Sequence, residues 1–218
     1  MSTVTEELFV LTIYERKNSI LPSPVQAVPY MIIGAMLVDL ISAGKLHLVE
    51  DKKIMLAEAS PTGQRYLDAI LETIQISGKS KKLTYWMTTF ANRYKRLQRM
   101  LLQNLVQNGL VVESEEQLCW VLCPDEAGRV SSTKFQRKER LRAMVMANQN
   151  ADEQSIYLLA LLQNFGLLEF LFTADEIKAA GRGVKDLLKA NPNTAYILRQ
   201  IDEISTAAAI ASAMRDPV

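Results

Sequence analysis

Apolar residues recur at helical spacing along most of this chain. Between positions 30 and 42 they occupy nearly every face, interrupted only by Gly34 and Asp39, and this predicts a helix enclosed by neighbours. Elsewhere the apolar stripe is narrower, as in amphipathic helices that cover a core. These later helices are expected over 66–74, 86–106 with a break near 88–92, 134–146, 153–172, 174–190 and 194–214.

Two stretches follow a period of two instead. Residues 46–56 and 110–122 each contain two short apolar runs on either side of a polar or acidic turn, the pattern of a β-hairpin. We find no internal repeat and no low-complexity segment. The predicted fold class is therefore mainly α, a compact multi-helix domain with two small β-hairpins, and residues 1–218 are expected to form a single domain.

Composition excludes several classes of protein. The 218 residues contain 25 Lys and Arg against 24 Asp and Glu, so the net charge of +1 gives no global attraction to nucleic acids or anionic membranes. Because 49% of the residues are hydrophobic, disorder is excluded as the main state. Glu6 and Glu7 stand where a secretory signal has basic residues, and the longest apolar tract, 28–43, contains Asp39. We expect a cytoplasmic protein.

Catalytic chemistry has little support. The only histidine, His47, lies in the first hairpin without a glycine-framed serine nearby, and we expect its imidazole on the solvent side of a strand. Cys119 and Cys123 lie in or beside an apolar strand, where free cysteines usually pack as small hydrophobes. The glycines at 181 and 183 fall within a helical pattern without a preceding strand. We expect no enzyme, no cofactor and no metal.

The strongest local charge feature is the segment 134–142, in which five cations meet one anion at the start of a predicted helix. Lys134, Arg137 and Lys138 share one helical side through their spacing of three and four, and Arg140 follows them. Arginine binds phosphate with two hydrogen bonds, and a helix N-terminus adds backbone donors. The segment is a candidate phosphate site, although charged helix faces are often only solvated.

A rival interpretation comes from a second basic face at 93–99, which precedes the second hairpin. A helix followed by a two-stranded wing also occurs in winged-helix DNA readers. The acidic turn at 113–116 would repel phosphates where such a wing should contact them, so nucleic-acid binding is the less favoured alternative.

Seven short strings are spread along nearly the whole chain. They are EELFVL at 6–11, GAMLVDL at 34–40, GKL at 44–46, PTG at 61–63, NLVQNGL at 104–110, LLALL at 158–162 and GLL at 166–168. Singly these strings are weak, but their order and spacing together are specific. Through them the chain resembles the Golgi phosphoprotein 3 family along nearly its whole length.

This resemblance implies a non-catalytic, mostly helical domain with a basic pocket for a phosphoinositide headgroup such as phosphatidylinositol-4-phosphate. Eukaryotic members build that pocket from a tryptophan, an arginine and two cations on a later helix. Pro24 and Ile33 occupy the first two positions here, and neither can bind a headgroup. The later cations correspond to Lys134 and Arg137, with Lys138 or Arg140 in a shifted register.

Two further differences from the eukaryotic members bear on membrane insertion and on the source of the protein. The segment 148–153 is polar where those relatives have a hydrophobic membrane-inserting loop, and few residues precede Glu6, so we expect weak insertion and a bacterial source. The expected partner is an anionic phospholipid headgroup at the cytoplasmic membrane surface, or at the cytosolic face of the Golgi in a eukaryote. A protein-interaction scaffold without lipid binding and a homo-oligomer remain open.

Overall fold

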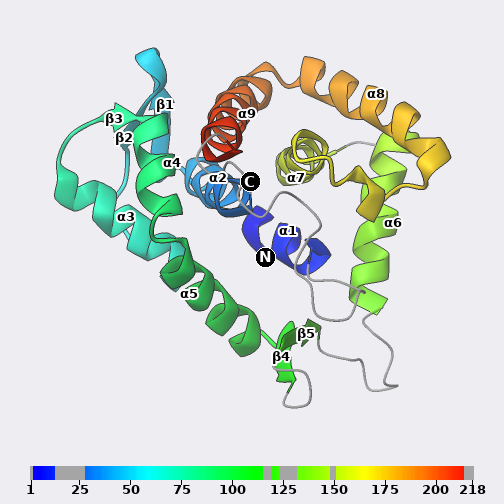
Figure 1. Cartoon of the computed structure of the whole chain (residues 1–218), viewed down its shortest axis with the longest axis horizontal. Coiled ribbons are helices and arrows are strands. Elements are labelled where there is room, and N and C mark those ends of the chain that lie inside the picture. The colour runs from blue at the N-terminus through cyan, green and yellow to red at the C-terminus, as the bar shows by residue number, and fades with distance from the viewer. Residues whose placement is uncertain (1, 13–27, 115–118, 123–131, 148–150, 214–218) are drawn as a thin grey trace. The chain divides into compact units, whose positions relative to one another are not determined.

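The computed structural model describes residues 2–12, 28–114, 119–122, 132–147 and 151–213, and most of them are helical (Figure 1). The prediction of a mainly α fold is confirmed. The α-helices span Val4–Thr12 (α1), Val28–Ser42 (α2), Arg65–Ser77 (α3), Leu83–Ala91 (α4), Tyr94–Gln107 (α5), Ser132–Met146 (α6), Glu153–Asn164 (α7), Ala174–Ala190 (α8) and Pro192–Ala213 (α9). The strands span Leu46–Val49 (β1), Lys53–Leu56 (β2), Lys81–Lys82 (β3), Val111–Ser114 (β4) and Cys119–Leu122 (β5).

Contacts between residues divide the chain into two compact units. One comprises residues 24–104 with 196–218, and the other comprises residues 1–23 with 105–195. Two of the three boundaries between them fall within α5 and α9. The expectation of a single domain stays a prediction.

The unit of residues 24–104 and 196–218 is built on α2. This helix has an unbroken run of buried side chains because apolar residues cover nearly all of its faces, as the sequence predicts. It packs against α4, α3 and β1. Gly34 is needed here, since a Cβ at this position would lie 2.8 Å from Cγ2 of Ile201 in α9. The glycine lets the two helices approach closely.

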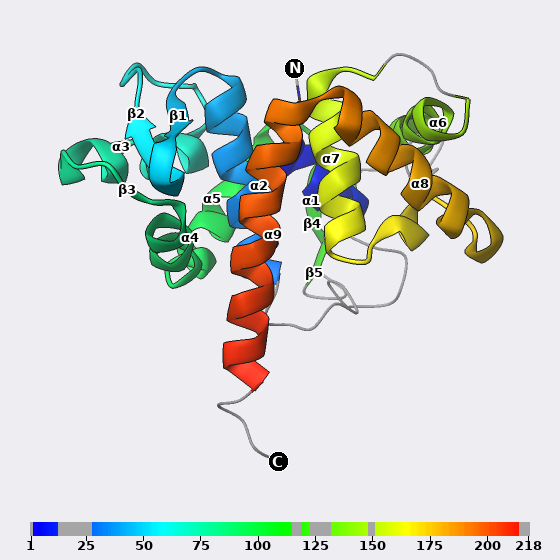
Figure 2. The same cartoon turned by 90° about the horizontal axis from the view of Figure 1, so that it is seen from above.

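The first predicted hairpin forms as expected but belongs to a three-stranded antiparallel sheet. Its strands β1 and β2 pair with Leu46 opposite Leu56, and the imidazole of His47 is exposed, which confirms the predicted solvent side. The short strand β3 then pairs with β2, giving the order β1-β2-β3 (Figure 2). Sequence analysis missed β3, because two lysines in a polar linker have no strand pattern.

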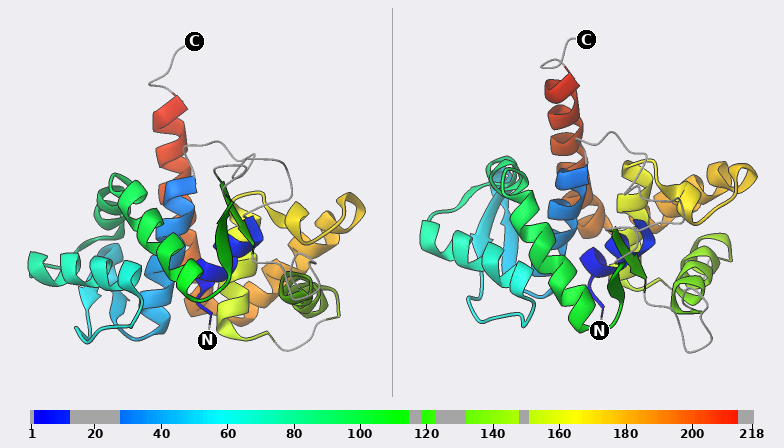
Figure 3. Two further views of the ribbon diagram at one scale, coloured as in Figure 1. Left: turned by 90° about the horizontal axis from the view of Figure 1, so that it is seen from below. Right: turned by 60° about the horizontal axis from the view of Figure 1, so that its bottom comes forward.

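The unit of residues 1–23 and 105–195 is built on α7, whose residues 155–162 are all buried. Helix α7 packs against α1 and α8, and α8 also packs against α6. The second predicted hairpin is present as β4 paired with β5, with Val111 opposite Leu122 (Figure 3).

One predicted helix is shorter than expected. The apolar pattern over 153–172 predicts a single helix, but α7 ends at Asn164 and a 3-10 turn follows at Leu168–Phe170 (η2). Gly166 adopts a left-handed backbone with φ of 70°, a conformation that stops a helix. The apolar residues after it still pack into the core, so the hydrophobic pattern continues although the helix does not.

Candidate functional site

Helix α6 contains the cations that the sequence singles out. Its apolar residues Leu141 and Met144 are buried, and the helix packs against α8. The two helices approach closely at Gly183 of α8, where a Cβ would lie 2.8 Å from Cγ1 and 3.0 Å from the carbonyl oxygen of Val145. These contacts set which basic side chains of α6 face the core and which remain at the surface.

Arg142 is bound within the protein. It donates hydrogen bonds of 2.9 and 2.7 Å to the two carboxylate oxygens of Glu176 and one of 2.6 Å to the carbonyl oxygen of Leu171. Its guanidinium carbon also lies 5.5 Å from the centre of the Phe172 ring. The hydrogen bonds from Arg142, together with that from the backbone N–H of Thr173, lower the pKa of Glu176 to about 2. This arginine therefore ties α6 to α8 and is occupied by its own chain.

Arg140 also has an internal partner. Its terminal nitrogen lies 2.5 Å from a carboxylate oxygen of Asp152, the residue that caps the N-terminus of α7. Burial raises the pKa of Asp152, but hydrogen bonds from Ser155 and the nearby Arg140 outweigh it, so the pKa lies below its ordinary value. Arg140 was a predicted site residue, and its charge is shared with this carboxylate.

Arg137 and Lys138 differ from these two arginines. Both side chains are partly exposed, and neither forms an ion pair with any described residue. One terminal nitrogen of Arg137 is buried and has no hydrogen-bond partner in the described part of the chain. Lys134 lies in the first turn of the same helix, but its side chain is outside the described residues. Arg137 and Lys138 thus keep hydrogen-bond donors available for an anion.

A carboxylate from α1 lies within electrostatic reach of this basic group. Burial raises the pKa of Glu7, while the charges of Arg137 and Arg140 act in the opposite direction, and the net pKa is above its ordinary value. Glu7 is therefore within electrostatic reach of both arginines. Sequence analysis missed it because the segment that contains Glu7 is far from α6 in the chain, and no local pattern links the two.

Other predicted positions lie elsewhere. Ile33 is buried in α2 and cannot contact a ligand. Pro24, Cys123 and residues 148–150 are outside the described residues, as is the side chain of Cys119. The only described residues of the polar segment before α7 are those from 151 onward, where Asp152 begins the helix.

A metal centre and a membrane-spanning helix are two further kinds of functional feature. In the described ranges, no group of three or more His, Cys, Asp or Glu side chains is arranged to hold a metal ion. Within the same part of the chain, no helix combines the length and apolar character that a bilayer crossing needs.

The structure of α6 thus separates cations that bind their own chain from cations that form no ion pair with any described residue. The mainly helical fold agrees with the family resemblance that the motif strings of the sequence indicate. The family model described as Golgi phosphoprotein 3 (GPP34) matches residues 4–214, which is nearly the whole chain. The chain belongs to the Golgi phosphoprotein 3 family.

Proposed function

We propose that this protein is a non-enzymatic peripheral module that binds anionic phospholipid headgroups, phosphoinositides among them, through the first turns of α6. Lys134, Arg137 and Lys138 supply the cations. Arg140 contributes when its ion pair with Asp152 opens. Membership of the Golgi phosphoprotein 3 family supports a lipid-associated role.

The observation that carries the proposal is the difference in partners along one helix. Arg142 and Arg140 are ion-paired, whereas Arg137 and Lys138 have no ion pair among the described residues. Partly exposed cations that form no ion pair with any described residue favour an external oxyanion. Phosphate oxygens accept such hydrogen bonds well, and arginine offers two parallel donors to them.

The binding should be weak, reversible and sensitive to salt. Each cation near an anionic surface contributes about 1 kcal/mol, and salt at physiological concentration screens exposed charges beyond about 8 Å. Three cations therefore hold the protein at a membrane only while the surface stays anionic. Since Pro24 and Ile33 replace the tryptophan and arginine of eukaryotic relatives, specificity for one phosphoinositide should be low.

Vesicle sedimentation tests the proposal with the full chain. Vesicles of neutral phosphatidylcholine are compared with vesicles that also contain phosphatidylserine or phosphatidylinositol-4-phosphate. The double variant Arg137→Ala with Lys138→Ala should bind anionic vesicles roughly 30-fold more weakly, because two cations of about 1 kcal/mol are removed.

The matched control is Lys178→Ala with Lys185→Ala, which removes the same charge from exposed positions of α8 in the same unit. We expect the control to keep most of its binding. Equal pelleting with neutral and anionic vesicles, or equal losses in both double variants, would overturn the proposal and favour a protein-interaction scaffold.

A further inference from the structure

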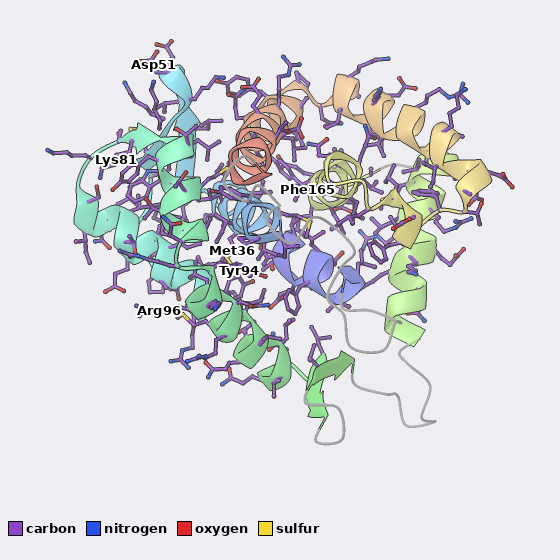
Figure 4. All side chains as sticks on the ribbon, viewed as in Figure 1. Met36, Asp51, Lys81, Tyr94, Arg96 and Phe165 are labelled. Atoms are coloured by element: carbon purple, nitrogen blue, oxygen red, sulfur yellow. The ribbon has the colours of Figure 1, made fainter. Side chains whose placement is uncertain are left out.

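A second basic surface lies in the other unit, in an open groove of about 720 Å³ beside the start of α4. The sheet supplies Lys53, Lys81 and Lys82, and α4 supplies hydroxyl groups, including those of Thr84 and Thr88. Every side chain that lines the groove can donate a hydrogen bond, and none of these described residues has a carboxylate. Figure 4 shows Lys81 where the sheet meets α4. The lining suits an anion rich in oxygen atoms.

The pairing of the strands concentrates this positive charge. Lys53 of β2 lies directly opposite Lys82 of β3 in the antiparallel ladder. Directly opposed side chains share one face of a sheet, and like charges in such a pair destabilise it. Asp51 offsets part of this repulsion, since its carboxylate lies 3.1 Å from Nζ of Lys53. Lys82 is exposed and has no ion pair among the described residues.

Helix α4 adds to the positive electrostatic potential of the groove. It begins immediately after β3, with Lys82 as its N-cap and no side-chain hydrogen bond to its first amides. The N-terminal amides of a helix have no partner within the helix, and its dipole is positive at that end. Nζ of Lys81 is held 3.9 Å above the centre of the Tyr85 ring, beside this helix end. Lysines and helix amides therefore meet at one place.

We propose that this groove binds a phosphate ester carried on a hydroxyl-rich body, such as a sugar phosphate or a phosphorylated inositol. The lysines bind the phosphate as point charges, and the threonine hydroxyls of α4 exchange hydrogen bonds with the hydroxyl groups of the body. The same chemistry is found in soluble sugar phosphates and in lipid headgroups. The proposal does not depend on lipid binding by α6, because the groove and α6 belong to different units.

Two-dimensional ¹H–¹⁵N NMR of the full chain tests this binding with three probes: inorganic phosphate, glucose and glucose 6-phosphate. Glucose 6-phosphate should shift the amide signals of residues 80–92 at lower concentration than phosphate, and glucose alone should shift none of them. Shifts that are absent, or spread equally over lysines throughout the chain, would overturn the proposal.

The decisive variant is Lys81→Gln with Lys82→Gln, and its matched control is Lys79→Gln with Lys95→Gln. Lys79 and Lys95 are exposed residues of the same unit and do not line the groove. Loss of two charged hydrogen-bond donors should weaken glucose 6-phosphate binding by at least about tenfold. The control should stay within about twofold of the unaltered chain. An equal loss of affinity in both variants would mean that glucose 6-phosphate is attracted only by the general positive charge of the surface, and it would overturn the proposal.

A second variant keeps the charges and removes hydroxyl groups. Thr84→Val with Thr88→Val changes two exposed positions of α4, where folding depends little on the side chain. We expect the preference for glucose 6-phosphate over inorganic phosphate to fall about threefold, and an unchanged preference would overturn the role of a hydroxylated body.

The source of the ligand is separated with vesicles that contain phosphatidylinositol-4-phosphate. If a lipid supplies the phosphate, Lys81→Gln with Lys82→Gln weakens vesicle binding even when Arg137 and Lys138 are intact. If a soluble ester supplies it, the NMR shifts are lost and vesicle binding is unchanged.

Discussion

The two ends of helix α6 contain the same kind of side chain and use it differently. Toward its C-terminus, Arg142 makes three short hydrogen bonds to Glu176 and Leu171 and fastens α6 to α8. Toward its N-terminus, Arg137 and Lys138 have no ion pair among the described residues. One run of positive charge therefore contains an arginine that fastens the fold and cations that form no ion pair with any described residue. The acceptor groups that lie near each cation decide whether it fastens the fold.

The largest effect is expected from Arg142→Ala. The side chains of Arg142 and Glu176 are 26% and 27% exposed. The change removes the arginine donor of the Leu171 carbonyl and leaves the Glu176 carboxylate with the backbone N–H of Thr173. We expect the melting temperature to fall by roughly 5–10 °C, measured by circular dichroism. The control Arg140→Ala breaks an ion pair whose arginine is 61% exposed, and it should lower the melting temperature by roughly 0–2 °C. Equal losses would erase the difference between the two arginines.

The packing of α6 on α8 gives the second prediction, through two glycines of one helix. Gly183→Ala places a Cβ 3.0 Å from the backbone oxygen of Val145, and the two helices must move apart. We expect a loss of about 1–2 kcal/mol in the free energy of unfolding in urea. Gly181→Ala has open space around its new Cβ among the described atoms and should stabilise the protein by about 0.5–1 kcal/mol. The same sign for both variants would contradict this packing.

The pH dependence of the Arg142–Glu176 pair gives a third, smaller effect. Hydrogen bonds from Arg142 first, and then from Thr173, lower the pKa of Glu176 from its ordinary 4.5 to about 2 in the folded protein. The unfolded chain therefore takes up the proton first as the pH falls, and the stability from this charge is full above pH 4.5 and lost toward pH 2. The melting temperature of the unaltered protein should exceed that of Glu176→Gln at pH 7, and the gap should close through this window. A gap that stays constant down to pH 2 would refute an ionic origin.

The smallest expected effect comes from Glu7, whose carboxylate is within electrostatic reach of Arg137 and Arg140 in α6. Glu7→Gln removes a negative charge within electrostatic reach of Arg137 and Arg140, so a headgroup no longer competes with it. We expect affinity for phosphatidylserine vesicles to rise about threefold in sedimentation. Glu169→Gln removes the same charge from an exposed position of η2 and should change little. If both variants bind alike, Arg137 is not a headgroup contact.

Much of the fold could be predicted from local patterns. The enclosed helix α2, the two hairpins, the break between α4 and α5 and the bounds of α8 all follow from residue spacing, because each element needs only its own sequence to bury one face. Where a single residue outweighed the pattern, the prediction was wrong. Gly166 ends α7 although the apolar residues continue.

The candidate sites were less accessible to sequence analysis. Spacing places Lys134, Arg137 and Lys138 on one side of a helix. It does not show that Arg140 and Arg142 are the cations that form ion pairs with distant carboxylates. The lysine groove was missed altogether, since β3 pairs Lys82 with Lys53 from a separate strand. The glycines at 181 and 183 look equivalent in the sequence, yet only Gly183 lies against another helix among the described atoms.

The sequence by itself determined the mainly α class, most of the helices, both hairpins, the family and the presence of a basic helix. Only the tertiary structure decided which cations of that helix are ion-paired, because Asp152 and Glu176 reach Arg140 and Arg142 from 12 and 34 residues away. Helix and strand periodicity is a property of neighbouring residues. The energy of a charge depends instead on its distance from other charges in space, and folding sets that distance.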